Sequence, residues 1–296
     1  LLYAALVGAT VAGALLGAGL AGRHLALPSL EAAAGPDARR LLGVGAPLLA
    51  NGVLWLALGW TDTLMVGGMR GTEAAAYYSV ALKVATLAAM GLVAVSAVLP
   101  ERFGRLWRRG DRAGAGRVLR ESGYLAGALA VPVAVAFGLL AGEVLAVFGR
   151  PYAAGGTALR ILLAGQAVHA LSGFAGIALN MVGGHRQVLA VNAIAALLNV
   201  LLNVLLVPPF GIDGAAAASA TSLVVMNLVQ GGILVRAWGT RWFASGILAL
   251  AGLGLLALLG AVGLAALHLG ALATTAGAVV LTGSLATAAY LRWEAR

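Results

Sequence analysis

Residues 177–222 read IALNMVGGHRQVLAVNAIAALLNVLLNVLLVPPFGIDGAAAASATS, and this stretch decides the fold. Two apolar runs flank a Pro-Pro-Phe-Gly turn, and the first run contains Asn192, Asn199 and Asn203. Their spacings of seven and four residues place the three amides on one stripe of a helix. An amide in hydrocarbon is costly unless it is hydrogen-bonded, so this stripe must face protein or water.

The turn between the two runs predicts a sharp reversal of the chain. Pro208 and Pro209 end the first helix, and Gly211 and Gly214 allow the backbone to turn back. The alanine-rich run 215–220 then lets the next helix pack closely against its neighbours. The stretch therefore predicts two antiparallel membrane helices joined by a tight turn.

The composition indicates a polytopic membrane protein. The chain of 296 residues is 61% apolar and 10% charged, with a mean hydropathy of +0.99, whereas about a quarter of the residues of a soluble domain are charged. The absence of cysteine excludes disulfides, thiolate metal sites and a cysteine nucleophile. The net charge of +9 reflects arginines in short loops between apolar runs, as membrane orientation requires, rather than nucleic-acid binding.

The hydropathy pattern predicts an all-α bundle of about nine transmembrane helices. A helix needs about 20 apolar residues to cross a bilayer, and the candidates are 1–22, 41–68, 75–100, 121–148, 154–182, 187–208, 214–235, 243–267 and 270–291. The longest basic linker, 101–120, holds seven arginines. With this linker and the C-terminus in the cytoplasm, 15 of the 19 basic residues lie on the cytoplasmic side.

Three further stretches extend the pattern of the quoted one. They are ARRLLGVGAPLLANGVLWLALGWTDTLMVGG at 38–68, AAYYSVALKVATL at 75–87 and VLPERFGRLWRRGDRAGAGRVLR at 98–120. In this order and spacing the chain resembles the C-terminal half of polysaccharide-biosynthesis flippases. These proteins belong to the multidrug/oligosaccharidyl-lipid/polysaccharide exporter superfamily, whose members typically have 12 to 14 helices in two six-helix bundles.

The resemblance implies a domain organisation. Residues 1–22 would be the last helix of an N-terminal bundle whose first five helices are absent, and 23–40 a cytoplasmic linker. Residues 41–240 would be the second six-helix bundle, followed by two C-terminal helices at 241–296. We expect this chain alone not to transport, because alternating access needs one body to move against another.

Asp62 and Lys83 are the charged residues that stand out within predicted spans. Each lies about seven residues from the predicted outer end of its helix, which is about 10 Å deep, and intramembrane charges usually face a partner or an aqueous cavity. Asn51 and Trp55 share a helical stripe with Asp62. Two interpretations remain open, namely a polar cavity that meets an anionic lipid-linked sugar and an ion pair that only fixes helix packing.

Two other residues are candidates for the same cavity. Arg160 suits a pyrophosphate because its planar guanidinium binds such oxygens well, although an arginine so near an interface also reaches water by extending outward. His169 is either a proton carrier or a hydrogen-bonding packing residue. The asparagines of the quoted stretch and Asn227 also have two interpretations. They either form hydrogen bonds between helices or line the cavity.

These features favour transport over catalysis. The sequence contains no His/Glu metal cluster, nucleophile elbow or phosphate-binding loop, so we expect no enzyme activity, cofactor or metal. The resemblance implies a flippase that moves a polyprenyl-pyrophosphate-linked oligosaccharide across the bacterial cytoplasmic (inner) membrane for polysaccharide biosynthesis. The expected partners are that lipid-linked oligosaccharide, membrane lipids and a partner chain or N-terminal half, but not nucleic acid. The alternatives are a cation-coupled multidrug exporter, a lipid II flippase and a non-transporting membrane scaffold.

Overall fold

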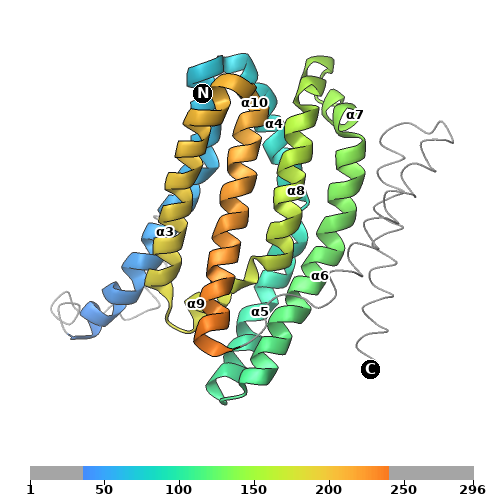
Figure 1. Ribbon diagram of the computed structural model, residues 1–296. Helices are drawn as coiled ribbons and strands as arrows, with labels where there is room; N and C mark the ends of the chain where they lie inside the picture. The colour runs from blue at the N-terminus through green and yellow to red at the C-terminus, as the bar shows by residue number, and fades with distance from the viewer. Residues whose placement is uncertain (1–35, 240–296) are drawn as a thin grey trace, which may run out of the picture. The chain divides into compact units, whose positions relative to one another are not determined.

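The computed structural model describes residues 36–239, and all regular structure in that range is helical (Figure 1). The chain divides into two compact units, residues 1–48 and 49–296, and the account below concerns the second. The predicted helices 1–22, 243–267 and 270–291 lie outside the described residues. The helices are α3 (Pro36–Arg70), α4 (Thr72–Leu87), α5 (Met90–Arg108), α6 (Arg112–Leu139), α7 (Ala141–Ala146), the 3-10 helix η1 (Arg150–Gly155), α8 (Gly156–Ser172), α9 (Phe174–Met181) and α10 (His185–Trp238).

Several of these helices are long and apolar enough to cross a membrane. Four segments qualify within the described range, namely Gly45–Arg70, Arg112–Leu139, Arg150–Met181 and His185–Ala237. The pair α4 and α5 makes a fifth candidate, bent by 48° at the break between the two helices. The prediction of an all-helical membrane protein is therefore confirmed, whereas the total of nine helices stays a prediction.

Helix α10 is two antiparallel arms rather than one rod. A straight helix of 54 residues would be about 81 Å long, far more than the roughly 30 Å of a hydrocarbon core. Gly211 breaks the helix with φ 58° and ψ −132°, values that suit glycine. A Cβ added at Gly214 would collide with the carbonyl oxygen of Leu206, which shows how tightly the chain doubles back.

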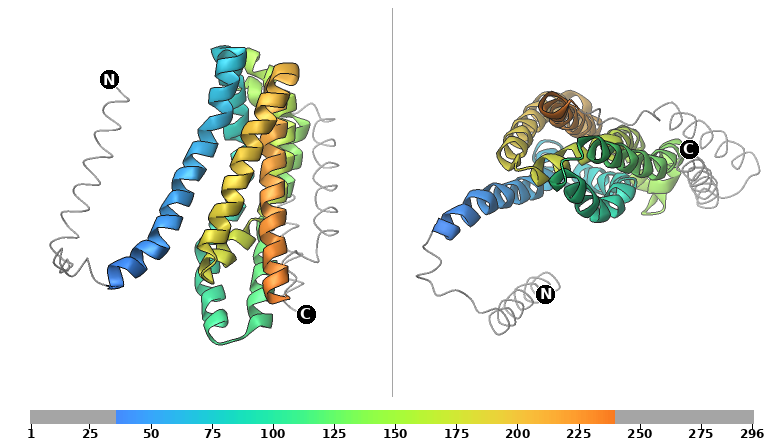
Figure 2. Two further views of the ribbon diagram at one scale, coloured as in Figure 1. Left: turned by 60° about the vertical axis from the view of Figure 1, so that its left-hand side comes forward. Right: turned by 90° about the horizontal axis from the view of Figure 1, so that it is seen from below.

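Hydrogen bonds between the two arms fix their register. Asn203 and Ser219 both bond to one carboxylate, and each lies eight residues from Gly211. Gln230 donates to Asn192 at 2.7 Å, and each of these lies nineteen residues from Gly211. The predicted hairpin is thus present and centred on Gly211, and the two arms run side by side in yellow and orange in Figures 1 and 2.

The basic segment 101–120 is not the linker that hydropathy predicts. Helix α5 continues to Arg108 and α6 begins at Arg112, so only a short turn separates them. Asp111 ends this turn by accepting a hydrogen bond from the Gly114 amide at 2.8 Å, which is a helix N-cap. The prediction was wrong because arginine is a good helix former, so the helices extend past their apolar parts.

Small residues bring the helices close enough to enclose a site. A Cβ at Gly165 of α8 would lie 2.9 Å from the Cβ of Ala220 on the second arm of α10, and the Gly165 position therefore sets how closely these helices approach. A Cβ at Gly123 of α6 would lie 2.8 Å from the Leu171 carbonyl oxygen of α8. Helix α8 is consequently held between α6 and α10, with one face available to a cavity.

Candidate functional site

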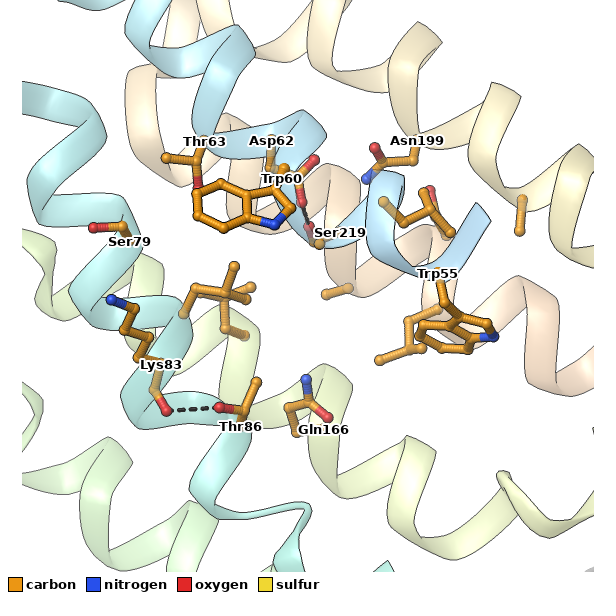
Figure 3. A pocket seen from close by; sticks show the side chains of 18 of the residues that line it. Trp55, Trp60, Asp62, Thr63, Ser79, Lys83, Thr86, Gln166, Asn199 and Ser219 are labelled. Atoms are coloured by element: carbon orange, nitrogen blue, oxygen red, sulfur yellow. Dashed lines mark hydrogen bonds between the residues drawn. The ribbon is translucent and has the colours of Figure 1, made fainter. Parts of the chain in front are cut away.

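A cavity of about 510 Å³ lies among α3, α4, α8 and α10 (Figure 3). Its volume is in the range usual for small-molecule sites. Apolar side chains make up much of its wall, but polar and aromatic groups project into it from all four helices. These are Trp55, Trp60, Asp62, Thr63, Ser79, Lys83, Thr86, Gln166, Asn199, Ser219 and Ser222.

Asp62 is buried at the wall of this cavity with an exposed fraction of 4%. Its Oδ1 accepts a hydrogen bond from Asn203 Nδ2 at 2.7 Å. Its Oδ2 accepts from the hydroxyl of Tyr78 at 3.1 Å and from the hydroxyl of Ser219. The carboxylate therefore joins α3, α4 and both arms of α10 through three neutral donors, which compensates part of the cost of its burial.

Lys83 lies in the same cavity but is not the partner of Asp62. It comes from the α4 side, whereas Asp62 lies on the α3 side next to Ser219 (Figure 3). Among residues 36–239 Asp62 and Lys83 form no ion pair within 4 Å, so the ion-pair interpretation of these two residues does not hold. The physical reason is that both oxygens of the Asp62 carboxylate already accept hydrogen bonds from neutral donors on α4 and α10. Lys83 is thus the one cationic side chain among the residues that line the cavity.

Three amide side chains, those of Asn51, Asn192 and Gln230, form a hydrogen-bonded triad farther from the Gly211 turn than Asp62 is. Asn192 donates to Asn51 Oδ1 at 2.5 Å, and its own Oδ1 accepts from Gln230 Nε2 at 2.7 Å. The triad connects α3 to both arms of α10. Asn51 therefore takes part in hydrogen bonds between helices and does not line the cavity.

His169 also makes a contact between helices. Its ring nitrogen Nδ1 is 3.0 Å from Asn227 Nδ2 and 3.3 Å from Asn227 Oδ1, on the second arm of α10. The centroid of its ring is 6.3 Å from that of Trp55. Trp55 lines the cavity and is 39% exposed, so the histidine packs behind the indole rather than among the lining residues.

Arg160 is placed outside the cavity. Its Nε donates to the carbonyl oxygen of Gly138 on α6 at 2.9 Å, and the side chain is exposed. An exposed arginine near the end of a span extends toward water, as the alternative interpretation of this residue held. The structure therefore brings together Asp62, Lys83 and Trp55, but neither Asn51, Arg160 nor His169, around one space.

Sequence reasoning missed several residues of the site. Tyr78, Ser219 and Gln166 come from helices whose facing cannot be read without the packing. One signal was available for Ser219, because a hairpin centred on Gly211 places it opposite Asn203. Trp60 lines the cavity together with Trp55.

The arrangement can hold a ligand that is polar, partly anionic and able to lie against aromatic rings. Hydroxyls and amides offer hydrogen bonds, Lys83 offers a positive charge and the two indoles offer flat apolar surfaces. Among the residues that the structure describes, no group of three or more His, Cys, Asp or Glu side chains is arranged to hold a metal ion. The fold and this cavity define a multi-pass membrane protein with a chamber between its helices that is lined by apolar and polar side chains.

Comparison with known families identifies the family. Residues 47–205 match the model of the MatE family, which is more than half of the chain, and the chain therefore belongs to the MatE family. This agrees with the resemblance to the multidrug/oligosaccharidyl-lipid/polysaccharide exporter superfamily.

A curated relative is the probable flippase AglR of Haloferax volcanii, 26% identical over 177 residues. The match covers 59% of this chain and 37% of that relative, so the chain spans well under two thirds of its length. No solved structure matches the chain.

Proposed function

We propose that this chain forms part of a flippase that moves a polyprenyl-pyrophosphate-linked oligosaccharide across a membrane. The observation that carries the proposal is the cavity itself, in which Lys83 is the one cation and Asp62 is already hydrogen-bonded to neutral donors. The ammonium group is therefore available to an anionic headgroup. The family membership and the name of the archaeal relative support the same conclusion.

The physical problem for such a protein is the sugar. Its hydroxyls would lose their water partners in hydrocarbon, at a cost that prevents unaided crossing. In the proposed mechanism the sugar enters the cavity, where Ser79, Thr86, Gln166 and Asn199 replace water as hydrogen-bonding partners. The pyrophosphate approaches Lys83, and the polyprenyl tail stays in the bilayer. Alternation of access between the two sides follows the rocking of helical bundles, as in other transporters.

The organisation that goes with this proposal is the one expected from the sequence. In this proposal residues 41–240 form a six-helix transporter bundle, 1–22 and 241–296 are flanking membrane helices, and 23–40 is a cytoplasmic linker, of which residues 36–40 are the first residues of α3. The chain acts as a transporter rather than an enzyme and works with its lipid-linked substrate, surrounding lipids and a second bundle. We assign it to the inner membrane of a bacterium and to polysaccharide biosynthesis, although the named relative is archaeal.

Lys83 is the residue to test. Lys83→Met removes the charge and retains most of the volume, whereas Lys83→Arg retains the charge. We expect purified Lys83→Met protein to bind a fluorescent polyprenyl pyrophosphate at least tenfold more weakly than wild type and Lys83→Arg to stay within about threefold. Arg160→Gln is the matched control, because it removes a cation that lies outside the cavity. Unchanged binding in Lys83→Met would contradict the proposal.

Cation-coupled export is a second candidate that one observation favours. Asp62 has no positively charged side chain within 4 Å among residues 36–239, and Asn203 Oδ1 beside it is buried with no hydrogen-bond partner. A carboxylate and an unpartnered amide oxygen together suit a bound proton or monovalent cation. Drug accumulation measured with and without sodium in the medium separates this candidate from the flippase. Only a sodium-coupled exporter would lose activity when sodium is replaced, and Asp62→Asn would abolish that dependence on sodium.

A further inference from the structure

A second pocket lies at the end of the bundle where α3 ends and α10 turns back. Its volume is about 550 Å³, similar to that of the cavity, and it shares no lining residue with the cavity. Arg70 lies eight residues beyond Asp62 on the same helix, which is about 12 Å farther toward the predicted outer surface. The residues that line this hairpin-tip pocket are Arg70, Glu73, Ala74, Tyr77, Pro209, Phe210, Gly211 and Ile212.

The guanidinium of Arg70 is held over the hairpin turn. Its Nε donates to the carbonyl oxygen of Val207 at 3.3 Å, a carbonyl near the point where the helix of α10 breaks. The other four N–H groups of the guanidinium form no hydrogen bond or ion pair with the described residues. Gly211 lies directly beneath, since a Cβ there would be 3.7 Å from Nη2 of Arg70. Any larger side chain at this position would extend toward the pocket.

Glu73 supplies an acceptor on the wall of the same pocket. The hydroxyl of Tyr77 donates to one oxygen of the Glu73 carboxylate, and the ring of Tyr77 is fixed by an edge-on contact with Tyr152 at 5.3 Å between centroids. Arg70 and Glu73 are opposite in charge and near in sequence, yet they form no ion pair within 4 Å. The two charges therefore remain available on the wall of one pocket.

An apolar surface completes the pocket. Phe210 is 63% exposed at the tip of the hairpin and lies between Pro209 and the broken position at Gly211. Its ring offers a flat apolar face to a ligand. The pocket thus combines fixed donors, a fixed acceptor and an aromatic surface.

We propose that this hairpin-tip pocket binds a neutral, polyhydroxylated ligand, namely a sugar unit of the glycan after it leaves the cavity. Hydroxyls of one sugar ring can accept from Arg70 and donate to Glu73, and such charge-assisted hydrogen bonds are roughly twice as strong as neutral ones. The C–H face of the ring lies on Phe210. A fully anionic ligand is disfavoured by Glu73, and a cationic one by Arg70. The position of this site in a transport sequence rests on the proposed function, but its binding of sugar does not.

The test uses sugar binding rather than transport. The chain contains no cysteine, so Thr72→Cys places a single thiol for a fluorescent label on an exposed residue between Arg70 and Glu73. The labelled protein in nanodiscs is titrated with maltotriose and with chitotriose, and inorganic pyrophosphate serves as the anionic comparison. We expect a saturable fluorescence change with at least one of the two sugars and none with pyrophosphate.

Variants of the lining residues test whether the sugar binds in this pocket. Glu73→Gln keeps the shape and the hydrogen bond from Tyr77 but removes the charge, and Phe210→Ala removes the aromatic surface. We expect each to weaken sugar binding at least tenfold, while Arg160→Gln leaves it unchanged because Arg160 lines neither the cavity nor this pocket. Arg70→Lys retains a donor for Val207 and tests the guanidinium without freeing that carbonyl.

Three results would overturn the inference. They are the absence of saturation with both sugars, a response to pyrophosphate equal to the response to sugar, and sugar binding by Glu73→Gln that is as strong as that by Arg160→Gln. Retention of polyprenyl pyrophosphate binding in a protein that fails these tests would leave the proposed function intact, so the two proposals fail separately.

Discussion

The neutral hydrogen bonds around Asp62 predict that Asp62 and Lys83 contribute independently to stability. If the two formed a buried ion pair, removal of one partner would cost about 3–5 kcal/mol and removal of both would be nearly neutral. In the structure Asp62 instead accepts from Tyr78, Asn203 and Ser219. The double variant Asp62→Asn with Lys83→Met, measured beside both single variants, distinguishes these cases.

The expected size of each effect follows from the contacts. Asp62→Asn keeps one oxygen for Asn203 but turns the other into an N–H group, so the hydroxyls of Tyr78 and Ser219 must rotate and accept. Both hydroxyls can do so, and Tyr78 also has Ser219 within 3.1 Å. We therefore expect a loss of about 1–2 kcal/mol, the difference between charge-assisted and neutral hydrogen bonds at this site. Lys83→Met should change stability by less than about 0.5 kcal/mol, because the side chain is exposed to the cavity and unpaired.

The assay is the free energy of unfolding in mixed micelles titrated with sodium dodecyl sulfate. The coupling energy should be below about 0.5 kcal/mol, the limit of additivity for residues with no shared partner. A coupling above about 1.5 kcal/mol, with the double variant as stable as wild type, would refute this reasoning and restore the ion pair.

Three further predictions follow from other parts of the structure. Gly214→Ala should prevent the hairpin from folding because the added Cβ would collide with the Leu206 carbonyl, whereas the control Gly232→Ala has no atom within 4 Å of its Cβ and should fold normally. Monodisperse elution of the Gly214 variant on size-exclusion chromatography would contradict this. Ala113→Cys, at an exposed position in the first turn of α6, should be labelled only after permeabilisation of cells, and labelling from outside would reverse the predicted orientation. Asn192→Leu should destabilise the protein by about 1–3 kcal/mol, measured by the same micelle titration, because Gln230 is buried and loses its acceptor; an unchanged unfolding free energy would show that water replaces the amide.

Much of the fold within the described residues was predictable from the sequence. The hairpin at Gly211 was recognisable because two prolines and a glycine interrupt apolar runs, and these residues act on the backbone wherever they occur. The membrane class was predictable because hydropathy depends on composition alone. The extent of α5 and α6 was not, since arginines at 101–120 extend helices as readily as they form loops.

The sequence by itself indicated a helical membrane protein of the multidrug/oligosaccharidyl-lipid/polysaccharide exporter superfamily, with Asp62, Lys83 and the asparagine stripe as polar groups within its apolar helices. Only the tertiary structure decided the partners of each group. Asp62 bonds to donors 16, 141 and 157 residues away, which leaves Lys83 unpaired, and Arg160 bonds to a backbone carbonyl outside the cavity. Depth in a membrane follows from position along one helix, whereas a hydrogen-bonding partner depends on how helices are rotated against one another, and that rotation is set by the packing of the whole bundle.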